Sequence, residues 1–491
     1  MALQQPGFLA LKSETNNRYL RYIHQDIEGV HGILQFSGEE VLSPYAKFQV
    51  EVEEPATINN NNRRLVHIRS CYNNKYWRRA DQNSRWIVAG ADERKADQNL
   101  WSCTLFEPIK NDIDSSQIRL RHVHSGHYLK ISPTNECLFI SQNFDVFTVI
   151  DWNALVIFPK YLAFKVDVNG VGNYLRVQTI DTHPYLQFSA TDPTERQKEN
   201  KVVTAGDGSV RIMSTFTKKF WRRNSSRDDN ISNNWIWADS DDTNNRDSNT
   251  LFRPVKVEAN PGDVNVVVAL RNLGNNNFCN TNNDVSCLTA DSPNTTPGPD
   301  AHLIVEELVM SRTISDLNFR LADARIYNRE IDQNMAEVEY ENPSAEVPAS
   351  KTLKLFYEDE RTSTWNTSAD DVSFTAFIQT TLTSDTPFVV QDEGVRIRVS
   401  GNFDGAYQWG QHLKSKTQIE RRFPVVVPPR HKVTVKLLAT KASCDIPFSY
   451  SQRDTLISQT PAIITCLKEG GLYSGKSLYN FYHTTETEPL P

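Results

Sequence analysis

The strongest constraint on this 491-residue chain is an internal repeat. Five short motifs occur twice in the same order, offset by 144 to 155 residues. Self-similarity of this kind indicates duplicated structural units. The sequence therefore predicts two homologous domains over 1–153 and 154–309, followed by a different part over 310–491. The motif pairs are FLALK at 8–12 and YLAFK at 161–165, NRYLR at 17–21 and NYLR at 173–176, LQF at 34–36 and at 186–188, LVHIRSCYNNKYWRR at 65–79 and SVRIMSTFTKKFWRR at 209–223, and TLFEPI at 104–109 and TLFRPV at 250–255.

A finer repeat divides the first copy into three. NRYLR, NKYWR and GHYLK place an aromatic ring at Tyr19, Tyr76 and Tyr128, which are separated by 57 and 52 residues. Each follows a small polar turn, as expected for short strands joined by turns. Three such units indicate a closed all-β domain with pseudo-threefold symmetry, and we expect a β-trefoil whose core receives the three tyrosines. The second copy has aromatic residues at similar places, Tyr174, Phe220 and Phe278.

Composition limits the partners and the compartment. The net charge of −7 gives no electrostatic case for nucleic acid as a partner. Seven cysteines without metal-type spacing favour free thiols in a reducing compartment. The first residues lack a charged and then apolar leader, and no stretch approaches the ~18 apolar residues of a membrane-spanning helix. We expect the protein in the cytosol, or in the cytosol and nucleus.

The chain lacks the sequence signatures of an enzyme. His122, His124 and His127 cluster, but they lie in an alternating strand-and-turn segment without an acidic or cysteine partner at ligand spacing. No nucleophile elbow, phosphate loop or paired carboxylates stand out. We expect a binding protein with no catalytic residues, no metal and no cofactor. A glycan-active enzyme remains a minor alternative.

Two polar loops combine asparagine with tryptophan. The first copy continues ADQNSRWIVAG after NKYWRR, and the second continues NSSRDDNISNNWIWADSDD after KKFWRR. A sugar presents an apolar C–H face that stacks on an aromatic ring, and hydroxyls that bond amides or charged groups. The alternative is that each tryptophan folds back as the core of its own loop. The carbohydrate-binding candidates are Asn83, Arg85 and Trp86 in the first copy and Asn234 and Trp235 in the second.

The first two thirds of the chain resemble a known family. KSETNNRYLRYIHQDIEGVHGILQFS, YNNKYWRRADQNSRWIVA and WSCTLFEPI make residues 5–309 similar to the amaranthin family of plant agglutinins. The resemblance implies two β-trefoils per chain, head-to-tail dimers and a galactosyl–N-acetylgalactosamine ligand bound between subunits. It also implies that the loop from Asn83 to Trp86 holds the sugar. Arg85 stands where the family prototype has an aromatic residue, so we expect a different specificity.

Residues 370–403 contain two alternating segments, which predict an amphipathic β-hairpin. A polar turn and the apolar stretch PFVV at 387–390 connect them. One hairpin cannot span a bilayer alone, whereas a ring of hairpins from several subunits closes a barrel. The alternative is an ordinary hairpin packed on its own sheet. The apolar face comprises Val372, Phe374, Ala376, Ile378 and Leu382, then Val395, Ile397 and Val399. The polar face includes Gln379, Arg396 and Arg398.

The flanks of this hairpin resemble the aerolysin-type β-pore-forming module. They are WNTS at 365–368 and the strands that run through VPPRHKVTVKLLATKASCDIPFSY at 427–450. The resemblance implies that 370–403 is a pre-stem that inserts into a membrane when subunits assemble. The residues assigned to insertion are Phe374, Ile378, Phe388, Val389, Val390 and Ile397. The residues assigned to the pore lining are Gln379, Arg396 and Arg398.

The sequence thus predicts two tandem β-trefoil domains followed by an elongated aerolysin-like β-sheet domain. We expect a lectin that binds glycans containing galactose or N-acetylgalactosamine and oligomerises with further copies into a transmembrane β-barrel pore. A role in plant defence or stress is implied by the resemblance. The alternative is a non-inserting lectin whose last part only drives oligomerisation and raises avidity.

Overall fold

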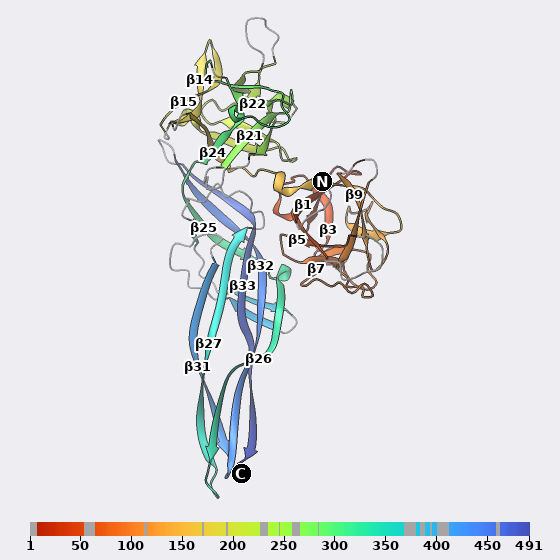
Figure 1. The fold of residues 1–491 in the computed structure, drawn as a ribbon, viewed down its shortest axis with the longest axis vertical. Helices are drawn as coiled ribbons and strands as arrows, with labels where there is room; N and C mark the ends of the chain where they lie inside the picture. The colour runs from red at the N-terminus through yellow and green to blue at the C-terminus, as the bar shows by residue number, and fades with distance from the viewer. Residues whose placement is uncertain are drawn as a thin grey trace.

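The computed structural model is an all-β molecule made of two barrels and one long sheet (Figure 1). Its described helical segments are single 3-10 turns of three residues. Within the described ranges, no helix has the length and apolar character needed to cross a membrane. The structure describes the chain except for residues 1–6, 54–63, 112–113, 115, 169–170, 193–194, 226–233, 245, 258–265, 283, 368–379, 383–387, 393–394, 400–411 and 458–461.

The first twelve strands form a β-trefoil. They are β1 (Gly7–Ser13), β2 (Tyr19–Tyr22), β3 (Leu34–Gly38), β4 (Phe48–Val52), β5 (Val66–Ser70), β6 (Tyr76–Arg79), β7 (Ile87–Ala91), β8 (Leu105–Lys110), β9 (Gln117–His122), β10 (Tyr128–Ile131), β11 (Leu138–Ser141) and β12 (Phe147–Asp151). Strands β1, β4, β5, β8, β9 and β12 pair in a closed ring, so the barrel has no free edge. The hairpins β2–β3, β6–β7 and β10–β11 branch from this ring at three places.

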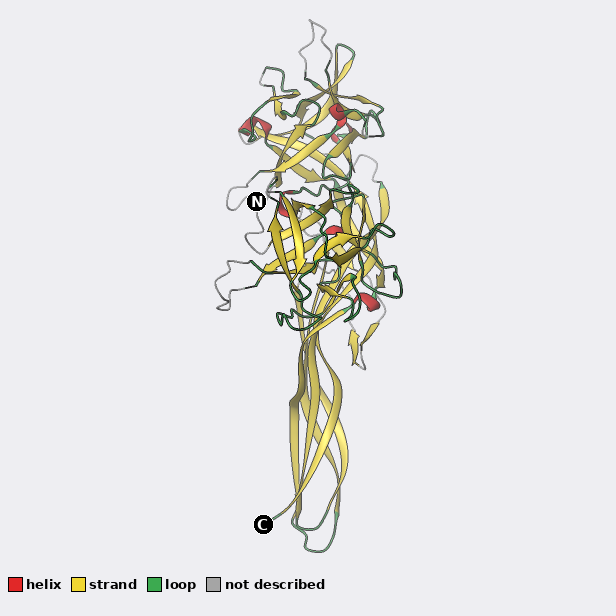
Figure 2. Ribbon diagram, turned by 90° about the vertical axis from the view of Figure 1, so that its right-hand side faces the viewer, coloured by secondary structure: helices red, strands yellow, loops and turns green. Residues whose placement is uncertain are grey.

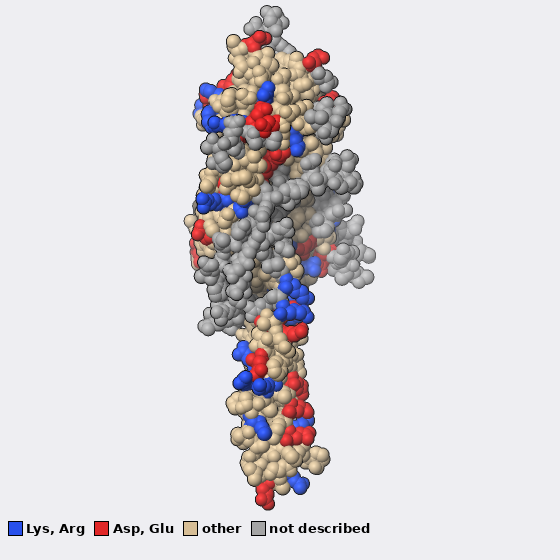
Figure 3. Space-filling view, turned by 90° about the vertical axis from the view of Figure 1, so that its left-hand side faces the viewer, with Lys and Arg blue, Asp and Glu red and all other residues tan. Residues whose placement is uncertain are grey.

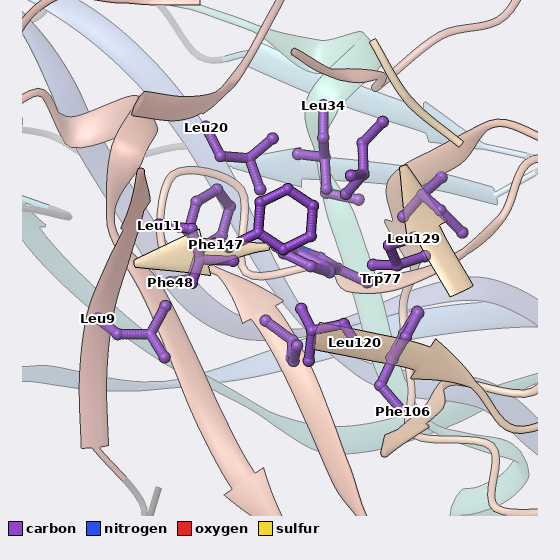
Figure 4. Close-up of a cluster of buried hydrophobic side chains, with 14 of the residues drawn as sticks. Leu9, Leu11, Leu20, Leu34, Phe48, Trp77, Phe106, Leu120, Leu129 and Phe147 are labelled. Atoms are coloured by element: carbon purple, nitrogen blue, oxygen red, sulfur yellow. The ribbon is translucent and has the colours of Figure 1, made fainter. Parts of the chain in front are cut away.

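Buried apolar side chains fill this barrel (Figure 4). Leu20, Trp77 and Leu129 belong to the cluster, and each is 0 % exposed. They follow the three repeated tyrosines directly in the sequence. The prediction that the tyrosines point into this core is wrong, because successive side chains of a strand point to opposite faces. The repeat exists, but the residue after each tyrosine, and not the tyrosine itself, packs in the core.

The tyrosines serve the outside of the barrel instead. Tyr19 is buried in a separate small cluster, and Tyr128 is half-buried with its ring 5.6 Å from that of Phe144. The Tyr76 hydroxyl donates to a Glu51 carboxylate oxygen at 2.9 Å. Its ring lies 5.4 Å from the guanidinium of Arg325, which belongs to the third part of the chain. Tyr76 therefore contributes to an interface between two parts of the molecule.

The next twelve strands repeat this architecture. They are β13 (Tyr161–Val168), β14 (Val171–Ile180), β15 (His183–Ala190), β16 (Asn200–Thr204), β17 (Val210–Ser214), β18 (Phe220–Arg223), β19 (Ile236–Ser240), β20 (Phe252–Lys256), β21 (Val266–Asn272), β22 (Phe278–Thr281), β23 (Leu288–Ser292) and β24 (Leu303–Glu307). Strands β13, β16, β17, β20, β21 and β24 close the ring. The core again holds the residues after the repeated aromatics, which are Leu175, Trp221 and Cys279.

The last part of the chain is a long, narrow sheet that projects below both barrels (Figure 2). Its strands are β25 (Val309–Phe319), β26 (Arg325–Asn342), β27 (Ala349–Thr367), β28 (Thr380–Leu382), β31 (His412–Val427), β32 (His431–Leu456) and β33 (Ile463–Pro489). Strand β32 pairs with β25, β26 and β33, and β33 pairs in turn with β27. One pair of long strands, β32 and β33, thus runs through the whole part and connects its two ends.

The lower half of this part is a small sandwich. The β26–β32–β33 sheet packs on the β27–β31 ribbon through Leu353, Leu355, Val433 and Val435, which are all buried. On the outside of the ribbon, charges of opposite sign face each other across the strands, as Lys416 and Glu358 do. On the face shown in Figure 3, both acidic and basic side chains line this half. Such exposed pairs add little stability, but they keep the sheet surface polar.

The predicted membrane hairpin is only partly described, and the described part differs from the expectation. Strand β28 pairs in parallel with β25, and β29 (Phe388–Asp392) pairs with β30 (Val395–Val399) as a separate two-stranded sheet. Residues 388–390 of the apolar stretch therefore begin one arm of a short hairpin, whereas we expected the stretch to connect two longer arms. Phe374, Ile378 and Gln379 lie outside the described residues.

The backbone register of this hairpin assigns its positions to two faces. Directly opposed positions of an antiparallel pair share one face. Phe388 opposes Val399 and Val390 opposes Ile397, so these four apolar positions share a face. Val389 opposes Arg398. In this pairing the position of Val389 therefore belongs to the face of the arginines, although the sequence analysis grouped Val389 with the insertion residues.

Candidate functional site

The loop between β6 and β7 is shaped by its own polar groups. The Asp81 carboxylate accepts hydrogen bonds from the backbone N–H groups of Asn83 at 2.7 Å and of Ser84 at 2.8 Å. The Arg79 guanidinium donates to the carbonyls of Gln82 and Ser84 at 2.7 to 3.0 Å. An Asx turn of this kind fixes a short loop without apolar packing. The loop therefore holds the following residues, 85 and 86, in a defined place.

Trp86 is half-buried at the end of this loop. Its indole Nε1–H donates to the Glu28 carboxylate at 3.1 Å. Its ring meets the ring of Phe139 edge-on, with centroids 5.9 Å apart. A hollow of about 380 Å³ opens beside this pair and is lined by Glu28, Val30, Ser84, Arg85, Trp86 and Phe139. The hollow combines two aromatic residues with one acidic and one basic residue.

The structure brings together some of the predicted residues. Arg85 and Trp86 line the hollow, whereas Asn83 is exposed and is not among its lining residues. The alternative that Trp86 packs back on the protein is partly true, because one side of the ring contacts the apolar cluster around Ile33. Sequence reasoning missed Glu28, Val30 and Phe139. They come from other parts of the repeat, and no local pattern connects them to the loop.

The equivalent place in the second copy is arranged differently. The Asn234 side chain accepts from the Arg223 guanidinium at 2.7 Å and donates to the Asp291 carboxylate at 2.6 Å. Burial lowers the pKa of Arg223, which nevertheless stays hydrogen-bonded to Asn234. Trp235 is half-buried and meets Tyr185 edge-on at 5.6 Å. Asn234 is thus held by protein groups, and Trp235 is the more available of the two predicted residues.

The three clustered histidines include two with clear structural roles. His122 is buried and its Nε2 lies 3.1 Å from the carbonyl oxygen of Cys103. Burial lowers the pKa of His122 to about 4, so the ring is neutral near pH 7 and donates this bond. His124 lies 2.9 Å from the carbonyl oxygen of Gln98 through Nδ1. In the part of the chain that the structure describes, no group of histidine, cysteine, aspartate or glutamate side chains could hold a metal ion.

The fold defines a protein with two copies of a β-trefoil domain and a long β-sheet module. The family model of the Agglutinin domain matches the chain twice, over residues 3–159 and 156–301. These matches cover more than half of the chain, which therefore belongs to the agglutinin-domain family. None of the curated proteins compared with the chain matches it.

Several solved structures are similar to this chain at low identity. A crystal structure of Lamprey immune protein is 11% identical, with 78% of this chain and 90% of that chain covered and a TM-score of 0.29. An aerolysin-like protein from Bombina maxima is 14% identical over 36% of this chain and 99% of that chain, with a TM-score of 0.24. ThreeFoil, a designed 3-fold symmetric protein, is 14% identical over 30% of this chain and 98% of its own, with a TM-score of 0.23.

Proposed function

We propose that this protein is a lectin that binds glycans in the hollow beside Trp86. The observation that carries the proposal is the composition of that hollow. The rings of Trp86 and Phe139 meet there, the Glu28 carboxylate accepts a hydrogen bond from Trp86, and Arg85 completes the lining. The membership of the agglutinin-domain family supports the same class of ligand.

The hollow suits a pyranose ring on chemical grounds. Aromatic rings offer flat apolar surface to the C–H face of the sugar. The Glu28 carboxylate accepts hydrogen bonds from hydroxyls, and Arg85 donates to hydroxyl oxygens. We propose galactose- or N-acetylgalactosamine-containing glycans as the ligands, with a profile that Arg85 shifts away from the prototype of the amaranthin family. Asn234 and Trp235 form a second, weaker candidate glycan-binding site.

A glycan array with the intact protein tests this proposal. We expect binding to a defined group of galactose-type glycans and loss of that binding in a Trp86→Ala variant with an unchanged melting temperature. The matched control is Trp101→Ala, which removes a half-buried tryptophan of the same domain that does not line the hollow. Equal loss from both variants, or unfolding of the Trp86→Ala protein, would contradict a dedicated site in the first copy.

We further propose that the chain oligomerises on glycan-bearing membranes and that residues 370–403 insert as a β-hairpin. The alternation of Ile397 with Arg396 and Arg398 in the sequence supports this, since a barrel strand is apolar toward lipid and polar toward the lumen. Strands β29 and β30 form their own two-stranded sheet, so they leave the long sheet intact if they move. Glycans on one surface would raise the local concentration of subunits.

Leakage from vesicles separates this proposal from its alternative, a lectin whose last part only drives oligomerisation. The vesicles should carry the glycan that binds best on the array, and matched vesicles should lack it. Glycan-dependent leakage with ring-shaped oligomers supports insertion. Glycan-dependent clustering of vesicles without leakage supports the alternative.

We propose a reducing compartment, the cytosol or the cytosol and nucleus, for this protein. The seven cysteines all lie in the described part of the chain, where they are thiols, and six of them are buried. Buried thiols suit a compartment in which disulfides do not form. We also propose that the protein binds glycans without catalysis, and turnover assays with glycosides test this point.

A further inference from the structure

A buried carboxylate of the long-sheet module is held by the first agglutinin domain. Asp323 lies in the 3-10 turn η6 (Leu321–Asp323), and its side chain is 3 % exposed. It accepts hydrogen bonds from the hydroxyls of Tyr22 and, at 3.1 Å, of Tyr72. His31 Nε2 lies 2.7 Å and His24 Nδ1 lies 3.2 Å from its two oxygens. We call these five side chains the latch.

Further polar contacts surround the latch. The Arg325 guanidinium donates to the carbonyl of Asp92 at 2.6 Å, and the Asn74 amide donates to Asp445 at 3.1 Å. The Tyr45 hydroxyl donates to a carboxylate of β33. Figure 1 shows the first barrel beside the upper part of the long sheet, where these residues meet. The interface is rich in hydrogen bonds, so its strength depends on the geometry of a few groups.

One hairpin of the first domain contacts both the latch and the hollow beside Trp86, which we call the glycan hollow. Ile27 and Val30 exchange two backbone hydrogen bonds of 3.2 and 2.9 Å across a two-residue turn. The turn residues, Glu28 and Gly29, both have positive φ, at 54° and 75°. Glu28 receives the Trp86 hydrogen bond on the hollow side. His31 binds Asp323 directly after the hairpin, so the two contacts lie within one short stretch of chain.

The turn has free space on both of its sides. The glycan hollow lies on one side and is lined by Glu28 and Val30. A second cavity of about 340 Å³ lies on the other side, and its lining includes Gly29, Val30, His31 and Asp323. Val30 lines both. Val30 also packs against a small buried cluster that includes Ile33 and Val88, whereas a Cβ built on Gly29 would meet no atom within 4 Å. A group that enters the hollow can therefore displace the tip of the turn, residues 28 and 29, into open space.

We propose that this hairpin couples the glycan hollow to the latch, so that a saccharide bound beside Trp86 loosens the hold of the first agglutinin domain on Asp323. The inference rests on the proposed glycan site. Sugar hydroxyls compete with the Trp86 indole for the Glu28 carboxylate, and the sugar ring presses on Val30. The turn then shifts, and His31, which follows it directly in the chain, loses its contact with Asp323. The first domain thereby acts as a ligand-sensitive clamp on the long-sheet module.

The second copy of the repeat lacks the two tyrosines of the latch, so the latch is not a by-product of the trefoil. The sequence repeat aligns Tyr22 with Val177, Tyr72 with Phe216 and His31 with His183. Phe216 is 53% exposed, whereas Tyr72 is 2% exposed. The ring of His183 stacks on Trp237 at 4.2 Å. Among the residues that the structure describes, the latch tyrosines occur only in the copy that contacts η6.

Hydrogen exchange of the full-length protein tests the coupling without any glycan. The readout is the exchange of residues 320–324, where the Arg320 N–H, for example, donates to the carbonyl of Pro447. Trp86→Phe keeps an aromatic ring but removes the donor to Glu28. We expect exchange of 320–324 to rise about tenfold, the size of one lost charge-assisted hydrogen bond. His124→Gln, a histidine of the same domain that binds a backbone carbonyl, is the matched control and should change nothing.

The reciprocity of coupled sites gives the test a second arm. If the hollow affects the latch, the latch must affect the hollow by the same factor. Asp323→Asn should therefore speed exchange of the Ile27 and Val30 amides. Tyr72→Phe, which removes only one hydroxyl, should do so to a smaller degree, and it serves if Asp323→Asn fails to fold. The coupling would be overturned if Trp86→Phe left the exchange of residues 320–324 unchanged and the latch variants left the exchange of the Ile27 and Val30 amides unchanged.

A third arm uses a polymer that displays galactose and N-acetylgalactosamine. We expect it to speed exchange of 320–324 in the wild type. Binding with unchanged or slower exchange would overturn the coupling and leave the glycan site standing. Absence of binding together with positive results in the two variant arms would overturn the proposed ligand and leave the coupling standing.

Discussion

At the scale of single residues, strand alternation decides what the repeated motifs do. Tyr76 and Trp77 are neighbours in the same repeated motif, but only Trp77 enters the core of the barrel. Tyr76 bonds Glu51 and contacts Arg325 on the outside. A sequence motif shows that both positions matter to the fold. Only the placement of the strand in the barrel shows which of the two side chains faces the core and packs there.

The first prediction separates these two neighbours. Trp77→Ala should lower the free energy of unfolding of the first domain by about 3–5 kcal/mol, because it leaves a cavity in a packed core. Tyr76→Phe keeps the ring and loses one hydrogen bond, so its cost should be about 1 kcal/mol. Guanidinium titrations of both variants measure this difference. Equal losses would contradict the assignment of Trp77 to the core.

The second prediction concerns Glu28, which sequence analysis did not identify. Glu28→Ala removes the carboxylate from the described lining of the glycan hollow. Glycan affinity should fall about tenfold, since a hydrogen bond to a charged group contributes about 1.5 kcal/mol or more. Glu39→Ala, which removes another exposed carboxylate of the same domain, should leave affinity unchanged. Titration calorimetry with the best array glycan provides the measurement, and unchanged affinity of the Glu28 variant would exclude Glu28 from the site.

At the scale of elements, short segments attached to the long sheet are the ones that can move without unfolding it. Strand β28 contributes three residues to the edge of the sheet, opposite residues 312–314 of β25. Strands β29 and β30 pair only with each other in the described sheets. By contrast, β32 and β33 share a ladder of more than twenty residue pairs. Local opening should therefore begin at β28 to β30.

The third prediction uses this difference. Thr313 lies opposite Thr381 in the parallel ladder, and neighbouring strands are close enough for a disulfide. The double variant Thr313→Cys/Thr381→Cys should block vesicle leakage when oxidised and recover it on reduction, with glycan binding intact in both states. The single Thr313→Cys variant is the control. Full leakage from the oxidised double variant would show that the 370–403 segment does not need to leave the sheet.

At the scale of the whole molecule, the latch makes the attachment of the first domain depend on pH. The hydrogen bond with Asp323 raises the pKa of His31 to about 9, against the opposing effect of burial, and Asp26, 2.7 Å from Nδ1, adds to the rise. Burial alone would raise the pKa of Asp323, but hydrogen bonds from His24, His31 and Tyr22 hold it well below its usual range. At any pH between the pKa of Asp323 and that of His31, the latch contains a carboxylate that faces a protonated His31.

The fourth prediction follows from the signs of these shifts. A raised histidine pKa contributes stability that is complete below the unfolded pKa of about 6.5 and is lost as pH rises through about 9. A depressed carboxylate pKa contributes stability that is complete above the unfolded pKa of about 4 and is lost as pH falls further, through the folded pKa. The latch should therefore remain closed in mild acid and loosen in mild base. Exchange of residues 320–324 from about pH 5 to about pH 9.5, corrected for intrinsic rates, measures this, and His31→Gln should flatten the profile. Opening in mild acid would contradict the prediction.

The sequence by itself determined the number of domains and the class of their fold. Five motifs in the same order require two similar units, and the threefold recurrence of an aromatic motif indicates three similar strand pairs in each. These patterns are local, because each depends on residues that are neighbours in the chain. For the same reason the sequence placed Arg85 and Trp86 in one loop beside the repeated motif, and both line the hollow.

Only the tertiary structure decided which side chains meet across the chain. Glu28 and Phe139 join Trp86 because three hairpins of the trefoil converge, and Asp323 meets Tyr22 because the long-sheet module packs against the first domain. The contact between Tyr22 and Asp323 spans 301 residues. A pairing at that separation has no local period, since it depends on how two finished domains pack. Packing between finished domains also explains why the two copies differ in their surroundings although they are alike in sequence. The turn η6 packs against the first copy through Asp323.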